Sequence, residues 1–229
     1  MRHEELEDIA VRLAAPFKAL PRAEALLKLH PAILALLARG RPVPPAELAA
    51  VVGRPVEEVL SDLAVQRSVE YTEEGEIAGY GLTLRETPHR VTFGGTTLYT
   101  WCALDTLMYP VVLGRSFEVE SPCAGTGNPV RVSVSPEGVE SVSPPSAVVS
   151  IVIPEDVRDV RASFCNSVHY FVSRDAASGW LKEHPDGLLL PVEDAFTVGM
   201  LRNREIVGSL GSLGADAKRP ADGVEGCCG

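Results

Sequence analysis

The first third of the chain has the spacing of apolar residues that is typical of amphipathic helices. From Glu4 to Phe17, apolar side chains recur every three or four positions and would line one face of a helix. A second helix is predicted from Arg22 to Ala38, because Pro21 precedes it and Arg39-Gly40 supplies a cation and a glycine at its end. Two shorter helices are expected over residues 45–52 and 56–65, with a Gly-Arg-Pro turn between them.

A two-stranded ribbon is predicted after these helices, over residues 69–84, with its turn at Glu73-Glu74-Gly75. Helix, short turn, helix and ribbon together have the outline of a winged helix-turn-helix, whose usual function is DNA binding through the second helix. That helix carries Glu57, Glu58 and Asp62 and no Arg or Lys, so DNA phosphates would repel it. We therefore expect a structural or docking role here and no nucleic-acid partner.

Predicted strands and short helices alternate in the remainder of the chain. A hairpin is expected over residues 88–100, with Gly94-Gly95 as its turn. A helix from Trp101 to Tyr109 follows, with Thr100 as its N-cap and Pro110 after its end. Further strands are expected as a pair over 116–135 and singly over 148–153 and 168–172, and further helices from an acidic start at 154–156 and over 176–183 and 192–207.

Composition and charge narrow the class of protein. The 229 residues are 45% hydrophobic and 23% charged, which is ordinary usage for a soluble globular chain, and the net charge of −10 argues against a surface that binds phosphates. The segment Met1 to Asp8 is charged and lacks the apolar core of a secretory signal, and the longest apolar run, Ala32 to Ala38, is too short to span a bilayer. We expect a cytoplasmic protein that does not bind membranes.

Five cysteines raise the main chemical question: Cys102, Cys123, Cys165, Cys227 and Cys228. Their odd number and wide spacing, in a chain without an export signal, do not describe a disulfide framework. Reduced thiols of this kind serve packing, metal binding or catalysis.

Cys102 and Asp105 form the most informative local pattern. If a helix begins at Thr100, Cys102 lies in its first turn, where free N–H groups and the helix dipole lower the pKa of a thiol. Asp105 follows three residues later on a neighbouring position of the same face. This pairs a soft metal ligand with a proton carrier. The spacing alone also allows a small core cysteine beside a solvated aspartate, and it leaves Cys165 equally open.

Two other readings of nearby residues are weaker. Cys102, Cys123, Cys165 and His169 could in principle bind zinc, but the chain has no Cys-x-x-Cys pair, and His169 in an apolar strand is more typical of a hydrogen-bonded core histidine. The glycine-rich segment Ala124 to Asn128 lacks the Lys-Ser/Thr pair of a phosphate-binding loop, and we expect a turn there.

Three segments resemble the organomercurial (alkylmercury) lyase family. LYTWCALDTLMYPVVLGRSFEVESPC, Leu98 to Cys123, is similar to the family's signature region, and SFCNSVHYF, Ser163 to Phe171, is similar to its second cysteine segment. GLTLRETPHR, Gly81 to Arg90, also fits the family. The resemblance covers roughly residues 32–207, with two motifs in the expected order.

This resemblance implies a fold and a domain organisation. The fold class is α+β, with a small helical winged-helix-like domain over residues 1–84, then a catalytic domain of mostly antiparallel strands with flanking helices over 85–207. The residues after Gly208 are rich in Gly, Ser, Ala and Asp, and we expect 208–229 to be a flexible tail that ends in Cys-Cys-Gly.

The resemblance also implies roles for particular residues. Cys102 and Cys165 match the two mercury-binding thiolates, Asp105 matches the carboxylate that relays the proton, and Cys123 matches a structural cysteine. Thiolates prefer soft metals, so they would bind R–Hg⁺ and make its carbon more carbanion-like. Protonation of that carbon would release R–H and leave Hg²⁺ as the bound product, with no cofactor required.

One position departs from the family pattern. Some members have a second cysteine directly after the one that Cys165 matches, whereas this chain has Asn166. A scheme with two thiolates survives this change, but one that needs adjacent cysteines does not.

Partners and alternatives remain as expectations. The expected partners are an organomercurial substrate, small thiols and a mercuric reductase that accepts Hg²⁺. The vicinal pair Cys227-Cys228 resembles the cysteine tail of mercuric reductases and could relay mercury. One alternative is a thiol-based mercury- or metal-sensing helix-turn-helix regulator. Another is a redox protein that cycles a Cys102–Cys165 disulfide.

Overall fold

Four helices begin the chain, as the sequence pattern predicts. The structure, a computed structural model, describes residues 1–211. The helices are α1 (His3–Lys18), α2 (Ala23–Leu37), α3 (Pro45–Val52) and α4 (Val56–Leu63). Each lies within two residues of its predicted bounds at either end, and the apolar face of α1 is buried, including Leu6, Ile9 and Leu13.

An antiparallel sheet of eight strands forms the largest element of the fold. Its order is β1-β2-β3-β5-β4-β6-β7-β8. The strands are β1 (Glu70–Tyr71), β2 (Ile77–Tyr80), β3 (Leu82–Thr83), β4 (His89–Phe93), β5 (Thr96–Thr100), β6 (Phe117–Pro122), β7 (Pro129–Ser135) and β8 (Gly138–Ser143). The predicted hairpin at Gly94-Gly95 joins β4 to β5, and the glycine-rich segment before Asn128 is the predicted turn, where the Cys123 amide donates to the Asn128 carbonyl at 2.7 Å.

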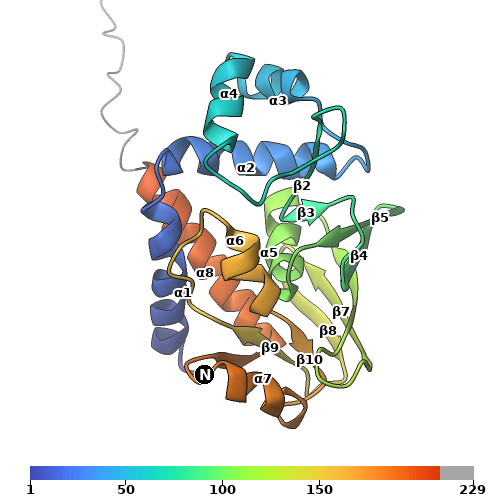
Figure 1. Cartoon of the computed structure of the whole chain (residues 1–229). Coiled ribbons are helices and arrows are strands. Elements are labelled where there is room, and N and C mark those ends of the chain that lie inside the picture. Colours follow the sequence, from blue (N-terminus) through green and yellow to red (C-terminus); the bar gives the residue numbers. More distant parts are fainter. Residues whose placement is uncertain (212–229) are drawn as a thin grey trace, which may run out of the picture.

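A second, three-stranded antiparallel sheet has the order β10-β9-β11, with strands β9 (Val148–Ile151), β10 (Tyr170–Phe171) and β11 (Leu188–Pro191). The remaining helices are α5 (Ala103–Leu113), α6 (Val160–Ser163), η1 (Cys165–Ser167), η2 (Asp175–Ala177), α7 (Ser178–Glu183) and α8 (Val192–Gly211). Helix α5 packs on the larger sheet, α8 packs on α5, and α1 packs along α8 (Figure 1). The α+β prediction is confirmed.

The N-terminal region is joined to the rest of the molecule by backbone pairing and ion pairs. Strands β1 and β2, the predicted ribbon, continue through β3 into the large sheet, where Leu82 pairs with Thr100. Ion pairs also tie the two ends of α1 to α8: the terminal ammonium group of Met1 lies 2.9 Å from Asp194, and Lys18 lies 2.8 Å from Glu205. The boundary at residue 84 stays a prediction.

The prediction for the helix after Thr100 is wrong at both ends. Thr100 belongs to β5, its hydroxyl donates to the carbonyl of Cys102 at 3.0 Å, and Cys102 itself is the extended N-cap residue of α5 (φ −147°). The helix continues through Pro110 to a left-handed C-cap at Gly114. A proline removes one backbone hydrogen bond, but the helix is buried from Ala103 to Pro110, and tertiary packing of this extent outweighs that loss.

Three further differences concern local elements. No helix starts at residues 154–156, because the Asp156 carboxylate binds the backbone and guanidinium of Arg158 and closes a turn. Helix α6 begins later, where Asp159 accepts a hydrogen bond from the amide of Ala162. Strands β8 and β11 were not predicted.

Within residues 1–211, no helix is both long enough and apolar enough to cross a membrane.

Candidate active site

Cys102, Asp105 and Cys165 lie together in the interior of the protein. Their potential ligand atoms, two thiol sulfurs and a carboxylate oxygen, all lie within 4.8 Å of one another. All three residues are buried, and Cys102 is completely inaccessible to solvent. In the part of the chain that the structure describes, this is the one group of three such residues with metal-binding spacing.

Two separate chain segments supply these side chains. Cys102 and Asp105 come from the start of α5, directly after β5, and Cys165 begins the short helix η1 that follows α6. The segments are joined by a backbone hydrogen bond in which the amide of Ala103 donates to the carbonyl of Val168 at 3.1 Å, while the amide of Val168 donates to the carbonyl of Cys165 at the same distance. The backbone therefore fixes the two thiols beside each other.

The expectation of a lowered thiol pKa at Cys102 is wrong. Burial raises the pKa of Cys102 well above its usual value, and the neighbouring Cys165 and Asp105 raise it further. At Cys165, the hydrogen bond from Cys102 lowers the pKa, but burial and the negative charge of Asp105 outweigh it, so the pKa is also raised. The position of Cys102 at the start of a helix lowers its pKa by less than burial raises it. Both thiols need a base before they can bind a metal as thiolates.

Asp105 has the properties of such a base. Burial raises the pKa of its carboxyl group from 3.8 to about 6, against the opposing effects of hydrogen bonds from Cys102 and Tyr109 and of the positive charge of Arg202. Its Oδ2 atom is buried and accepts no hydrogen bond from any residue that the structure describes. A carboxyl group with a pKa near neutrality can both accept and donate a proton under physiological conditions.

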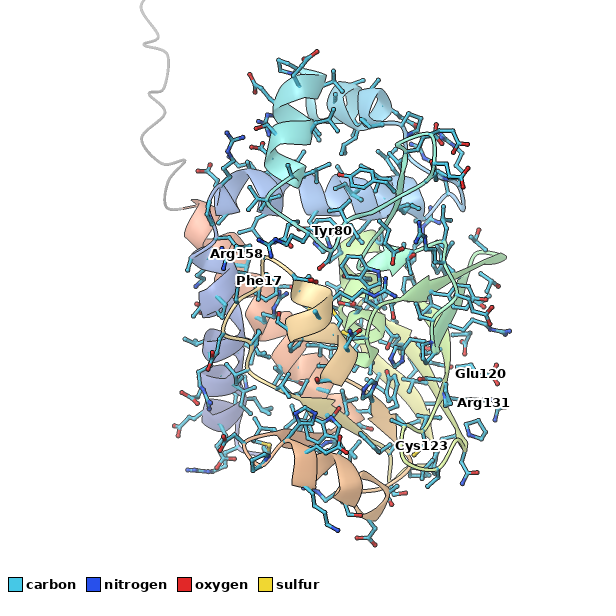
Figure 2. All side chains as sticks on the ribbon, in the orientation of Figure 1. Phe17, Tyr80, Glu120, Cys123, Arg131 and Arg158 are labelled. Carbon is cyan, nitrogen blue, oxygen red and sulfur yellow. The ribbon has the colours of Figure 1, made fainter. Side chains whose placement is uncertain are left out.

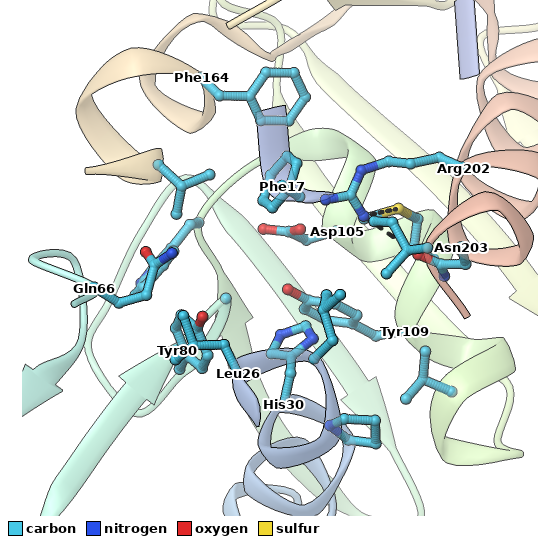
Figure 3. Close-up of a pocket in the computed structure, with 18 of the residues that line it drawn as sticks. Phe17, Leu26, His30, Gln66, Tyr80, Asp105, Tyr109, Phe164, Arg202 and Asn203 are labelled. Atoms are coloured by element: carbon cyan, nitrogen blue, oxygen red, sulfur yellow. Dashed lines mark hydrogen bonds between the residues drawn. The ribbon is translucent and has the colours of Figure 1, made fainter. Parts of the chain in front are cut away.

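A cavity of about 150 Å³ opens onto this site (Figure 3). Asp105 and Cys165 line it, whereas Cys102 has no exposed surface and does not. Helices α1 and α2 supply much of the apolar wall through Phe17 and Leu26. Its other walls come from α2, β2, α5, α8 and the segments that adjoin α4, β5 and α6. The residues that line these walls include His30, Gln66, Tyr80, Trp101, Tyr109, Phe164, Arg202 and Asn203.

Gly81 contributes to the shape of the cavity. It joins β2 to β3 with a positive φ of +87°, which glycine adopts without strain. A side chain at this position would collide with the hydroxyl group of Tyr109. The chain therefore needs glycine here both for its backbone conformation and for the close approach of Tyr109, whose own pKa is raised, chiefly by burial.

Three cavity residues were not predicted from the sequence. Arg202 is a buried cation on α8, Tyr109 lies one helical turn after Asp105, and His30 projects from α2 with its pKa lowered by burial to about 4. A signal for Arg202 was present in the sequence, because it follows the buried Val198 by four residues and so interrupts an apolar helix face with a charge. The other two have no comparable signal.

Cys123, the third cysteine among the described residues, does not join this site. Cys123 is buried near the far end of the large sheet, away from Phe17 and Tyr80 (Figure 2), and its sulfur accepts a hydrogen bond from the amide of Val172 at 3.4 Å. The zinc reading with Cys123 and His169 has no support among residues 1–211, since neither belongs to the cluster. Cys227 and Cys228 lie outside the described residues.

Comparison with known proteins gives consistent matches over most of the chain. A family model described as alkylmercury lyase matches residues 82–201, and one described as the helix-turn-helix domain of alkylmercury lyase matches residues 19–81. An alkylmercury lyase of Staphylococcus epidermidis is 53% identical over 167 residues, which cover 73% of this chain and 77% of the relative. One from Bacillus cereus is 43% identical over 224 residues, which cover 98% of each chain.

A solved structure is similar as well. The crystal structure of the mercury-bound form of MerB2 superimposes with a TM-score of 0.71 at 28% identity, and the match covers 89% of this chain and 99% of that one.

These matches, together with an α+β fold that has a helix-turn-helix region before a buried cysteine–aspartate cluster, place the chain among the lyases. The chain belongs to the alkylmercury lyase family. The predictions that it is an enzyme and that it acts on carbon–mercury bonds are confirmed at the level of the family. The roles of Cys102, Asp105 and Cys165 stay predictions.

Proposed function

We propose that the enzyme cleaves R–Hg⁺ by protonolysis, with Cys102 and Cys165 as mercury ligands and Asp105 as the proton relay. The observation that supports this most directly is the buried cluster, in which two sulfurs and a carboxylate oxygen lie within 4.8 Å of one another. Two soft donors at this spacing suit mercury, and a carboxyl group beside them can reach a carbon bonded to the same metal.

Binding begins at Cys165, which lines the cavity, whereas Cys102 has no exposed surface. The organomercurial arrives as a thiolate adduct, R–Hg–SR′. The Cys165 sulfur replaces R′S⁻ on mercury to give Cys165–S–Hg–R, and the leaving thiolate is the base that takes the Cys165 proton and departs as R′SH. The Asp105 carboxylate then takes the proton of Cys102, and the resulting thiolate becomes the second sulfur ligand of mercury.

Proton transfer completes the reaction. The neutral Asp105 carboxyl group donates its proton to the carbon bonded to mercury, the carbon–mercury bond breaks, and R–H leaves. Mercury remains as Hg²⁺ bound by two thiolates, and Asp105 is again a carboxylate. A pKa of about 6 suits both halves of this cycle. No electrons are transferred, so the scheme requires no redox cofactor.

Release of the product requires other thiols. Two molecules of a small cytoplasmic thiol remove Hg²⁺ as a bis-thiolate and restore the protons of Cys102 and Cys165. We further propose that Cys227 and Cys228 assist this transfer and that a mercuric reductase is the final acceptor. Replacing both tail cysteines by serine should then slow release to a mercuric reductase, and unchanged release would end the relay idea.

Headspace gas chromatography tests the central proposal. Reduced protein is incubated with methylmercury and excess thiol, and methane is measured. We expect methane from the wild-type enzyme and none from Cys102→Ser, Cys165→Ser or Asp105→Asn. Cys123→Ser is the matched control, because it removes a buried cysteine outside the cluster. Methane release by Asp105→Asn at the wild-type rate would contradict the role of the carboxylate.

The same experiment separates the alternative functions. A mercury sensor would bind mercury stoichiometrically and release no methane, with or without Asp105. A disulfide redox protein would exchange thiols and disulfides in the absence of mercury and would lose this activity on replacement of either cysteine. Neither alternative predicts that hydrocarbon release depends on Asp105.

A further inference from the structure

Buried polar atoms without hydrogen-bond partners gather at the active-site cavity. Within residues 1–211, four buried side-chain atoms lack such a partner: Asp62 Oδ2, Gln66 Oε1, Asp105 Oδ2 and Arg202 Nε. Asp62 Oδ2 lies 2.8 Å from a nitrogen of Arg54 and so has an ion pair. The other three residues all line the one cavity (Figure 3). Buried polar groups are nearly always paired, so this grouping indicates a polar ligand.

Arg202 is the most unusual of the three. Its residue is 9% exposed, and a guanidinium group keeps its charge in proteins. One nitrogen, Nη1, lies 3.3 Å from Asn203 Oδ1 and 3.9 Å from the sulfur of Met108, and the guanidinium carbon lies 4.1 Å from the ring centre of Phe17. No residue that the structure describes forms an ion pair with it. A buried cation without an anionic partner is costly to maintain.

The carboxylate of Asp105 is not the missing anionic partner of Arg202. It influences Arg202 electrostatically but lies beyond ion-pair distance, and it faces the two thiols. The cavity that Asp105 and Arg202 both line is large enough for a small ligand, because an engineered cavity of similar volume holds benzene. An anion beside Arg202 would therefore share the cavity with the mercury that Cys165 binds.

We propose that Arg202 binds the carboxylate of the thiol that carries the organomercurial, so that the enzyme prefers adducts of carboxylate-bearing thiols. This inference rests on the proposed function, in which R–Hg–SR′ exchanges its thiolate for Cys165. The carboxylate belongs to R′, takes no part in the exchange and leaves with R′SH. The unpaired oxygen of Gln66 would suit a donor group on the same thiol, such as an amine.

The overall charge of the protein makes this preference testable. With a net charge of −10, the enzyme as a whole repels anionic adducts, so a preference for a carboxylate requires a local cation. Two isosteric adducts of methylmercury, with 3-mercaptopropionate and with 3-mercaptopropionamide, differ only in this charge. Methane release from each is measured over a range of concentrations, with the same small excess of the matching thiol.

We expect the wild-type enzyme to have a KM roughly tenfold lower for the carboxylate adduct, the scale of one charge-assisted hydrogen bond. Arg202→Gln should abolish this difference, and Arg202→Lys should restore part of it. Arg204→Gln is the matched control, because Arg204 is exposed on the same helix. The effect of Arg202→Gln should appear in the ratio of the two KM values, whereas a merely structural role of Arg202 would change the KM values for both adducts alike.

Each contrary result has a distinct meaning. Equal KM values for the two adducts in the wild-type enzyme, with methane released from both, would overturn the inference and leave the proposed function intact. A preference that persists in Arg202→Gln would also overturn it. Absence of methane from both adducts would instead refute the proposed function. Should Arg202→Gln fail to fold, the wild-type comparison and Arg202→Lys still decide the question.

Discussion

Asp105 should destabilise the folded protein at neutral pH, and replacing it should reveal by how much. Its pKa is about 6 in the folded state, against 3.8 without its surroundings, and burial is the main cause. When the folded-state pKa of an acid is raised, the folded state binds more protons between the two values, so stability is highest below 3.8 and is lost as the pH rises through about 6. The difference corresponds to about 3 kcal/mol at pH 7.

The replacement Asp105→Asn removes this penalty while keeping the shape of the side chain. Urea unfolding of reduced, metal-free protein should show the variant and wild type equally stable near pH 4, and the variant more stable by about 3 kcal/mol near pH 7. Asp8→Asn, at an exposed position on α1, should show no such pH-dependent gain. The same Asp105→Asn protein should release no methane, so greater stability would accompany loss of activity.

Two results would refute this reasoning. One is a stability difference between Asp105→Asn and wild type that does not change with pH. The other is a variant that is less stable than wild type at pH 7, which would mean that interactions in the folded protein stabilise the ionised carboxylate enough to offset its burial.

In the wild-type enzyme, methane release should also rise as the pH passes through about 6, because the carboxylate form must accept the proton of Cys102.

Two further substitutions test the surroundings of the site. Gly81→Ala should raise KM strongly, because the new methyl group displaces the Tyr109 hydroxyl; an unchanged KM, with folding checked by circular dichroism, would speak against this wall of the cavity. Glu70→Gln should lower the unfolding free energy by roughly 1–3 kcal/mol, because the buried carboxylate accepts hydrogen bonds from Trp101 and Arg161. Urea unfolding measures this loss, and wild-type stability would show that the network contributes little.

Local patterns in the sequence predict part of this site and miss the rest for a physical reason. The spacing of Cys102 and Asp105 is a property of one helix, so the pairing could be predicted even though the helix start was misplaced. Cys165 comes from a distant segment, and only the family resemblance placed it beside Cys102. The thiol pKa was predicted in the wrong direction because helix position is visible in the sequence, whereas the extent of burial depends on tertiary packing.

The N-terminal helical region has a structural role at the active-site cavity. Helices α1 and α2 supply part of the cavity wall, including Phe17 and Leu26, and the ring of Phe17 packs against the guanidinium group of Arg202. The ribbon that follows supplies Glu70, which holds the residue next to Cys102. Helix α4 exposes the acidic side chains of Glu57 and Glu58 and carries no Arg or Lys that could bind a phosphate backbone. In this chain the N-terminal region, through α1, α2 and the ribbon, forms part of the wall of the active-site cavity.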